Sequence, residues 1–226
     1  MTPLSRSILR ACILAFAISL PLFVSAEEQA CDTVTAIETA TPGEIVDFFK
    51  RADKRVVTFI GYSGAEYEDR DAMLATAESI LDTLDPAKTL VNIGATPEGI
   101  GAVYSLARSK GFVATGIVST QAKEYDAALA PCIDRVFYVE DATWGGFLEG
   151  TDKLSPTSTA MVESSDLLIG IGGGAVGRDE LTAAKRMGKE VRFFSADMNH
   201  RKAIEKAEKK GLPAPTSFSG AADEVF

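Results

Sequence analysis

The sequence predicts an α/β protein built on a single doubly wound, mostly parallel sheet of about six strands with helices on both faces. Six short segments rich in β-branched and aromatic residues alternate with segments whose apolar residues recur at helical spacing. This alternation favours parallel pairing, because a helix after each strand returns the chain to the start of the next one. Glycine-bearing turns follow three of the strands, and ligands bind such sheets beyond the carboxyl ends of the strands.

Residues 1–26 have the pattern of a secretory signal peptide. Arg6 and Arg10 form a basic region, residues 11–20 are almost entirely apolar, and small residues precede a cleavage point after Ala26. We therefore expect a periplasmic or secreted protein with no membrane attachment after cleavage. An uncleaved anchor remains an alternative, although the apolar run is shorter than the roughly 20 residues that a spanning helix needs.

The mature chain would have 200 residues, which suits one domain with one substantial core. Removing Arg6 and Arg10 changes the net charge from −9 to −11. So acidic a chain does not bind nucleic acid or an anionic membrane through general electrostatics. Any phosphate must be held locally, by backbone N–H groups and a few basic side chains. Whether the protein is a monomer or a homodimer stays open.

Cys31 and Cys132 are the two cysteines of the expected mature chain. In an oxidising compartment two cysteines can pair, so a disulfide between them is one expectation. Two buried free thiols are the alternative, because the sequence does not measure their separation.

We expect residues 27–40 to form an N-terminal tether and residues 41–226 to form the domain. Thr41 is a capping residue followed by a proline and, three residues on, by Glu44, which predicts a helix start. The first half of the domain then repeats a strand, a glycine-bearing turn and a helix. The predicted strands are 55–60 and 89–93, the turns 61–64 and 94–101, and the following helices 69–84 and 102–110.

The second half continues the same alternation. Its predicted strands are 112–119, 134–140, 166–171 and 190–194, and its predicted helices are 123–129, 155–164, 177–187 and 198–210. The last helix shows a lysine and glutamate face typical of solvent exposure. Residues 141–154 form a polar loop around Trp144 that is longer than a connection needs, so a lid or binding loop and a plain surface loop are both open.

The most informative stretch is the glycine cluster after the strand at 166–171. Gly172, Gly173, Gly174 and Gly177 remove Cβ atoms that would keep a ligand from the backbone, and the helix that follows offers unpaired N–H groups to an anion. This pattern predicts a site for a nucleotide or a sugar phosphate. A tight turn without a ligand is the alternative.

The same glycines match the dinucleotide fingerprint, Gly172-x-Gly174-x-x-Gly177, with Asp197 near the spacing of a ribose-binding acid. A dinucleotide fold places this motif at its first strand, whereas here only one strand follows it. NAD binding is therefore retained as an alternative and no cofactor is assigned.

The carboxyl ends of parallel strands meet at one edge of a sheet, so the three glycine-bearing turns are expected to form one pocket. The residues expected to bind the ligand are Gly61, Ser63, Gly64, Gly94, Thr96, Gly99, Gly101, Gly172, Gly173, Gly174 and Gly177. Glu180, and with it Arg178, are the candidate catalytic residues behind the last turn.

Other chemistries find little support in the residues. His200 is the only histidine and no serine lies in a nucleophile elbow, which argues against a Ser-His-Asp system. A cysteine nucleophile would lack the same base. The acids Glu66, Glu68, Asp69 and Asp71 could bind a hard cation, but they stand where a helix begins, and acids there stabilise the helix dipole, so no metal site is assigned.

Three stretches resemble the SLOG superfamily, the Rossmann-like group that contains LONELY GUY (LOG, lysine-decarboxylase-like) phosphoribohydrolases and DNA-processing protein A. The resemblance runs from about Arg55 to Phe194. Its carriers are Thr58-Phe-Ile-Gly-Tyr-Ser-Gly64, Asn92-Ile-Gly-Ala-Thr-Pro-Glu-Gly-Ile-Gly101 and Ser165-Asp-Leu-Leu-Ile-Gly-Ile-Gly-Gly-Gly-Ala-Val-Gly-Arg-Asp-Glu180. It implies a Rossmann-like domain that binds a nucleotide-derived ligand.

The last stretch departs from the family's enzymes in several places. The enzymes have a proline, two glycines, an aromatic residue, a glycine-threonine pair and a glutamate. Gly173, Gly174 and Glu180 fit that order, whereas Gly172 replaces the proline, Ala175 the aromatic residue and Val176-Gly177 the pair.

A second departure concerns the helix before that strand. The enzymes carry an arginine-lysine pair about one turn before a methionine, and the arginine is implicated in catalysis. With Met161 as that methionine, this chain has Thr157 and Ser158. Two hypotheses follow: an exported binding protein for a nucleotide-like ligand, and a phosphoribohydrolase that cleaves the N-glycosidic bond of a nucleoside 5′-monophosphate with Glu180.

Overall fold

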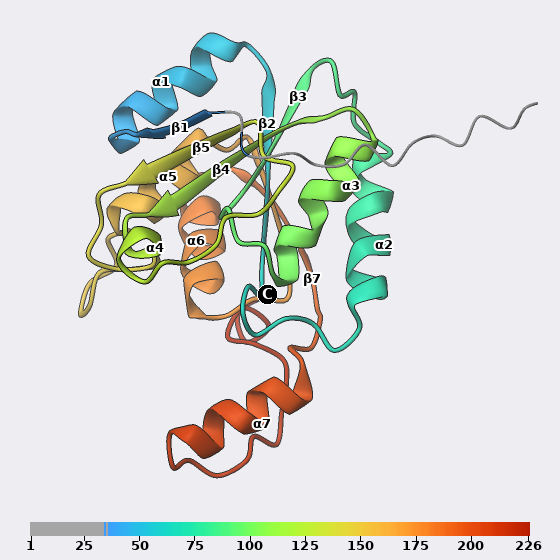
Figure 1. The fold of residues 1–226 in the computed structure, drawn as a ribbon, viewed down its shortest axis with the longest axis vertical. Helices are drawn as coiled ribbons and strands as arrows, with labels where there is room; N and C mark the ends of the chain where they lie inside the picture. The colour runs from blue at the N-terminus through green and yellow to red at the C-terminus, as the bar shows by residue number, and fades with distance from the viewer. Residues whose placement is uncertain (1–33, 35) are drawn as a thin grey trace, which may run out of the picture.

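A seven-stranded, entirely parallel sheet forms the centre of the computed structural model, which describes residue 34 and residues 36–226 (Figure 1). The strand order is β1-β5-β4-β3-β2-β6-β7. The strands are β1 (Ala36–Thr39), β2 (Arg55–Gly61), β3 (Thr89–Ile93), β4 (Val113–Ser119), β5 (Arg135–Val139), β6 (Leu167–Ile171) and β7 (Glu190–Phe194). The doubly wound parallel architecture expected from the alternating pattern, and implied by the resemblance, is confirmed.

The seventh strand is β1, which lies in the segment expected to be a tether, so the expectation of about six strands was one too few. It pairs in parallel with β5, from Ala36 opposite Arg135 to Thr39 opposite Tyr138. Its four residues show no run of buried apolar side chains, because an edge strand is covered little. The predicted signal peptide and Cys31 lie outside the described residues, so cleavage and the pairing of Cys31 with buried Cys132 stay predictions.

The helices follow the predicted order with modest changes at their ends. Thr41 and Glu44 form the expected capping box of the first helix. The helices are α1 (Pro42–Ala52), α2 (Arg70–Leu81), α3 (Val103–Ser109, after the 3-10 turn η1, Gly99–Ala102), α4 (Gln121–Glu124), α5 (Pro156–Ser164), α6 (Ala175–Arg186) and α7 (His200–Lys209). No helix in the described part of the chain has the length and apolar character to cross a membrane. The helix expected at 123–129 is only the short α4, since Asp126 takes a left-handed conformation (φ 50°).

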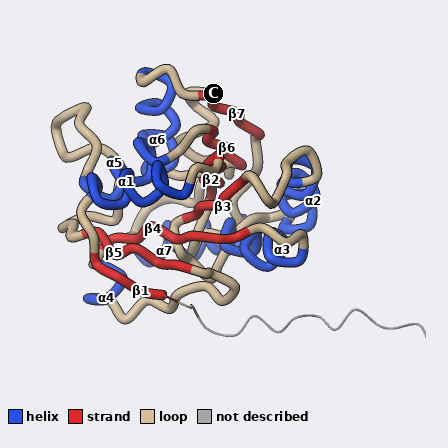
Figure 2. Tube along the Cα trace, turned by 90° about the horizontal axis from the view of Figure 1, so that it is seen from above, coloured by secondary structure: helices blue, strands red, loops and turns tan. Residues whose placement is uncertain are grey.

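The helices cover both faces of the sheet (Figure 2). In β2, Val57 and Phe59 face the core packed by α2 and α3, whereas Val56 and Ile60 face α1, α5 and α6. Strands that are buried on both faces have continuous runs of apolar residues, which explains why β2 and β6 can be recognised in the sequence.

The strand order reverses at β2: the strands that follow it in the chain are added first on one side of β2 and then on the other. The chain proceeds from β2 through β3 and β4 to β5 on one side, and then crosses back so that β6 and β7 lie on the other side of β2. The helices that follow β2 and β6 therefore leave on opposite faces. At such a switch point a crevice opens beyond the carboxyl ends of the strands.

Candidate functional site

A cavity of about 1050 Å³ lies at this carboxyl edge. Because β3, β2 and β6 are neighbours in the sheet, the three glycine-bearing turns come together here. The predicted site residues that line the cavity are Gly61, Ser63, Gly64, Gly94, Thr96, Gly174, Gly177 and Glu180. The expected convergence of the turns is therefore present in the structure.

Other predicted residues of these turns do not line the cavity. They are Gly99, Gly101, Gly172, Gly173 and Arg178. Asn92, at the start of the second turn motif, is buried inside β3 and hydrogen-bonded to Thr58 and Thr115. Asn92 therefore belongs to the core, and none of these residues is part of the cavity wall.

Several turn glycines serve close packing. A Cβ at Gly172, which has φ +56°, would lie 2.6 Å from Tyr62 Cε2 and 2.8 Å from the carbonyl oxygen of Ala196. The carbonyl oxygen of Gly173 accepts a hydrogen bond of 3.1 Å from the N–H of Ala222 in the C-terminal segment. The first half of the glycine cluster is therefore occupied by the protein's own chain.

The second half of the cluster is open. A Cβ at Gly174 would meet no atom within 4 Å, and Gly174 is the N-cap of α6 without a side-chain capping bond. The first turn of α6 contains no acidic residue, and its N–H groups have no intrahelical partner. Ala175, Val176 and Gly177 line the cavity, which narrows the expected phosphate position to Gly174–Gly177.

Glu180 lies one and a half turns into α6 and is buried against the cavity. Burial raises the pKa of its carboxyl group to about 7, a hydrogen bond of 2.6 Å donated by Ser158 Oγ to Oε1 opposes this rise, and the charge of neighbouring Asp179 adds to it. A carboxyl group with this pKa exchanges a proton near neutral pH. It can therefore act as a proton donor or acceptor for a ligand in the cavity.

Ser158 and Thr157 occupy the positions that the resemblance assigns to the basic pair. Ser158 Oγ accepts a hydrogen bond of 2.7 Å from the N–H of Gly146 while it donates to Glu180. Thr157 is buried and lines the cavity. Its hydroxyl oxygen has no hydrogen-bond partner of normal geometry among the described residues, although the hydroxyl helps to lower the pKa of Asp141. Neutral hydroxyls thus stand where the family's enzymes have cations.

The loop at 141–154 forms one wall of the cavity through Trp144. Trp144 is half exposed, and its ring lies tilted against Tyr125 with the centroids 5.8 Å apart. The loop is tied down beside it, because the N–H of Phe147 donates to Asp179 Oδ2 at 2.9 Å. Arg178 pairs with the other oxygen of Asp179 at 2.8 Å. These contacts support the binding-loop interpretation and hold Arg178 on the loop side of α6.

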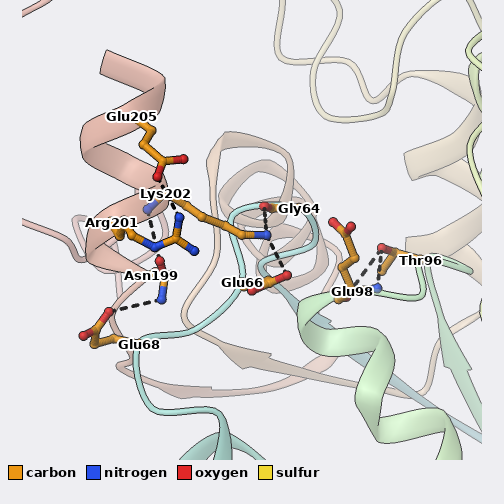
Figure 3. Close-up of polar contacts among 9 residues, drawn as sticks. All are labelled: Gly64, Glu66, Glu68, Thr96, Glu98, Asn199, Arg201, Lys202 and Glu205. Atoms are coloured by element: carbon orange, nitrogen blue, oxygen red, sulfur yellow. Dashed lines mark hydrogen bonds and ion pairs between the residues drawn. The ribbon is translucent and has the colours of Figure 1, made fainter. Parts of the chain in front are cut away.

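Helix α7 forms a wall of the cavity that was not expected from the sequence. Lys202, Lys206 and Lys209 line the cavity, where a solvated face had been expected. Their spacing of four and three residues puts them on one side of the helix, which is the signal that could have found them. Figure 3 shows Lys202 reaching from α7 to Glu66 and Gly64, with Glu98 of the β3 turn nearby.

Of the acids around residue 68, Asp69 acts at the start of α2 as expected, whereas Glu68 makes a contact with α7. Asp69 caps α2 by accepting a hydrogen bond of 2.8 Å from the N–H of Ala72. Glu68 accepts from the N–H of His200 at 2.8 Å and so connects the start of α2 with the start of α7. His200 Nε2 lies 3.3 Å from Asp197 Oδ2, and neither residue lines the cavity.

No family model matches this chain, and no curated protein matches it. Among solved structures it is similar to TM1055, a structural-genomics target, at 20% identity over 61% of this chain and 72% of that chain, with a TM-score of 0.45. It is also similar to the Moco carrier protein from Chlamydomonas reinhardtii, at 13% identity over 76% of this chain and 95% of that one, with a TM-score of 0.46. A second structure of that molybdenum cofactor carrier protein gives 16% identity over 62% and 76%, with a TM-score of 0.45. These TM-scores lie below 0.5, so the fold assignment rests on the sheet of this chain itself.

Proposed function

We propose that this protein binds a small nucleotide-like ligand and holds the ligand's phosphate at the first turn of α6. The observation that carries the proposal is the open N-terminus of α6 on the cavity of about 1050 Å³, at the switch point of the sheet. Unpaired N–H groups and the helix dipole favour an anion at that place. In an acidic chain, a phosphate needs such local donors.

The remaining lining suits the rest of a nucleotide. Apolar side chains such as Ile60, Ile100 and Met161 line the cavity together with the ring of Trp144, against which a base can stack. Uncharged polar side chains on the same walls, among them Ser63, Thr96 and Thr157, can bind ribose hydroxyls. Apolar walls with placed polar groups are typical of ligand sites.

A single substitution tests the phosphate position. Gly174→Val places a side chain over the first turn of α6 and leaves the fold intact, because the new Cβ meets no neighbour. We expect calorimetry with AMP to show at least about a tenfold loss of affinity. Gly43→Val is the matched control, since Gly43 also has open space and lies in the first turn of α1, away from the cavity. Equal AMP affinity in the wild type and both variants, or no AMP affinity in any of them, would refute the proposed site.

A second candidate function, hydrolysis of the N-glycosidic bond, is favoured by Glu180. Its carboxyl group is buried on the cavity wall and has a pKa of about 7, as proton transfer at neutral pH requires. Without a basic partner at Thr157 or Ser158, we place this activity second. A hydrolase should release base from AMP and lose about 100-fold or more in rate in Glu180→Gln, whereas a binding protein has no turnover to lose.

NAD binding remains a third candidate. Gly172 and Gly174 of the fingerprint lie between β6 and α6, and Gly177 lies in the first turn of α6, but Asp197, the expected ribose-binding acid, pairs with His200 outside the cavity. Glu98 lines the cavity and is the carboxylate available for a ribose diol. Calorimetry with NAD distinguishes this candidate from the proposed function. If NAD is the ligand, NAD should bind more tightly than AMP, and Glu98→Gln should weaken NAD binding.

We propose in addition that the protein is exported and cut after Ala26. The proposal rests on the basic, apolar and small-residue pattern of residues 1–26. N-terminal sequencing of the protein from the envelope or the medium should begin near Glu27. An intact Met1 on the protein in the cytoplasm would contradict it.

A further inference from the structure

The α7 wall of the cavity is strongly basic. Lys202, Lys206 and Lys209 lie on its cavity side, while Arg201 and Lys210 add two cations elsewhere on or next to the helix. This cluster contrasts with a chain whose net charge is −9. α7 extends beyond the carboxyl edge of the sheet, apart from α6 (Figure 1).

The lysines differ in whether the protein itself neutralises them. Lys202 Nζ lies 2.6 Å from Glu66 Oε1, so its charge is paired. Among the described residues, Lys206 and Lys209 form no ion pair. Two cations therefore face the cavity unpaired.

The acids that line the cavity do not neutralise this pair. Glu205 bonds to Arg201 at 2.7 Å. Glu180 bonds to Ser158, and its pKa of about 7 leaves it partly protonated at neutral pH. Glu98 belongs to the β3 turn, where its backbone bonds to Thr96, and like Glu180 it forms no ion pair in the described part of the chain. An anion near Lys206 and Lys209 thus meets a net positive surface on α7.

We propose that the ligand carries a second anionic group, which Lys206 and Lys209 bind while the first phosphate occupies the start of α6. This inference rests on the proposed function and names its ligand class, a nucleotide with two phosphates in place of a monophosphate. The cavity volume of about 1050 Å³ agrees with it, because that value slightly exceeds the roughly 300–1,000 Å³ of small-molecule sites.

Calorimetry with AMP, ADP and adenosine 3′,5′-bisphosphate tests the inference. In the wild type, at least one of the two ligands with an added phosphate should bind about tenfold more tightly than AMP. We call this tighter binding relative to AMP the second-phosphate advantage. The Lys206→Ala/Lys209→Ala double variant should lose the advantage and keep its affinity for AMP within about threefold of the wild type. The matched control, Lys88→Ala/Lys210→Ala, removes the same charge from residues that do not line the cavity and should keep the advantage.

The outcomes separate this inference from the proposed function. Equal affinity of the wild type for all three ligands, survival of the advantage in the Lys206/Lys209 variant, or its loss in the control would overturn the role of the two lysines. Gly174→Val serves as the reference in the same series. If it abolishes AMP binding while the lysine variant changes nothing, only the second anion site is wrong; if Gly174→Val leaves AMP binding unchanged, the proposed function itself fails.

Discussion

The two sides of the cavity are built by different kinds of interaction. The strand turns are held by buried contacts: Tyr67 donates from its hydroxyl to the carbonyl oxygen of Ile171 at 2.7 Å and accepts from the N–H of Tyr62 at 3.2 Å, which ties the β2 turn to the end of β6. By contrast, α7 has no buried residue. It is attached by Glu68, by the pair of Lys202 with Glu66, and by the ring of His200 stacked on Phe218.

The strand turns therefore supply the rigidity of the site, and α7 supplies its positive charge. Buried hydrogen bonds and close packing hold a phosphate position in one geometry, because any shift would leave polar groups unsatisfied. Exposed ion pairs contribute little and are screened by salt, so α7 supplies charge without fixing the geometry. Substitutions of packed residues in the turns should therefore lower the free energy of unfolding, and substitutions of the cavity lysines on α7 should lower the affinity for an anionic ligand.

The largest effect is expected for Gly172→Val. The new side chain would meet Tyr62 and the carbonyl oxygen of Ala196, and valine would have to adopt φ +56°. Left-handed strain and overpacking together should cost about 3 kcal/mol or more in the free energy of unfolding, measured by urea titration. Two residues away, Gly174→Val should cost about 1 kcal/mol or less. Equal losses at the two positions would remove the distinction between packed and open glycines.

The second prediction concerns the pH dependence that Glu180 gives to stability. Its folded pKa of about 7 exceeds the ordinary value of 4.5, so the protonated form favours folding and this contribution is complete below about pH 4.5. As the pH rises through 7 the contribution is lost, which amounts to roughly 3 kcal/mol. The difference in unfolding free energy between wild type and Glu180→Gln should shrink accordingly from pH 5 to pH 8. A difference that is constant with pH would contradict the burial of this carboxyl group.

A smaller loss is expected when Tyr67 is changed to phenylalanine. The substitution keeps the ring but removes the hydroxyl that connects the β2 turn with the end of β6. Leaving the carbonyl oxygen of Ile171 without its donor should cost about 1–3 kcal/mol in urea unfolding. Tyr125→Phe is the control, because Tyr125 is exposed and should show almost no change. AMP affinity should fall in Tyr67→Phe if the turn geometry matters for binding.

The smallest effect is expected on α7. Lys202→Ala removes an exposed ion pair with Glu66 and should change the free energy of unfolding by about 0.2–1 kcal/mol. Raising the salt concentration should reduce even this difference. A loss above about 2 kcal/mol would show that α7 is as firmly held as the strand turns, and the comparison would then fail.

The local pattern of the sequence determined the parallel sheet, the order of its helices and the three turns at one edge. Strands such as β2 and β6 are buried on both faces and are therefore continuous apolar runs, and the capping box at Thr41 is a local signal that needs no distant partner. Strand β1 was not predicted, because a short edge strand leaves most of its side chains exposed and has no continuous apolar run.

Tertiary structure alone decided which glycines line the cavity and which helix closes it. Gly172 and Gly174 are both glycines of one cluster in the sequence, yet Tyr62 and the carbonyl oxygen of Ala196 fill the space at Gly172, whereas the space at Gly174 is open. From the sequence, Lys206 and Lys209 were expected to lie on a solvated helix face. Their place on the cavity wall depends on the contact of Glu68 with His200, residues 132 apart in the chain, and no local pattern encodes that contact. Local residue patterns encode hydrogen bonding and burial along one element, whereas the walls of a cavity are set by contacts between elements far apart in the chain.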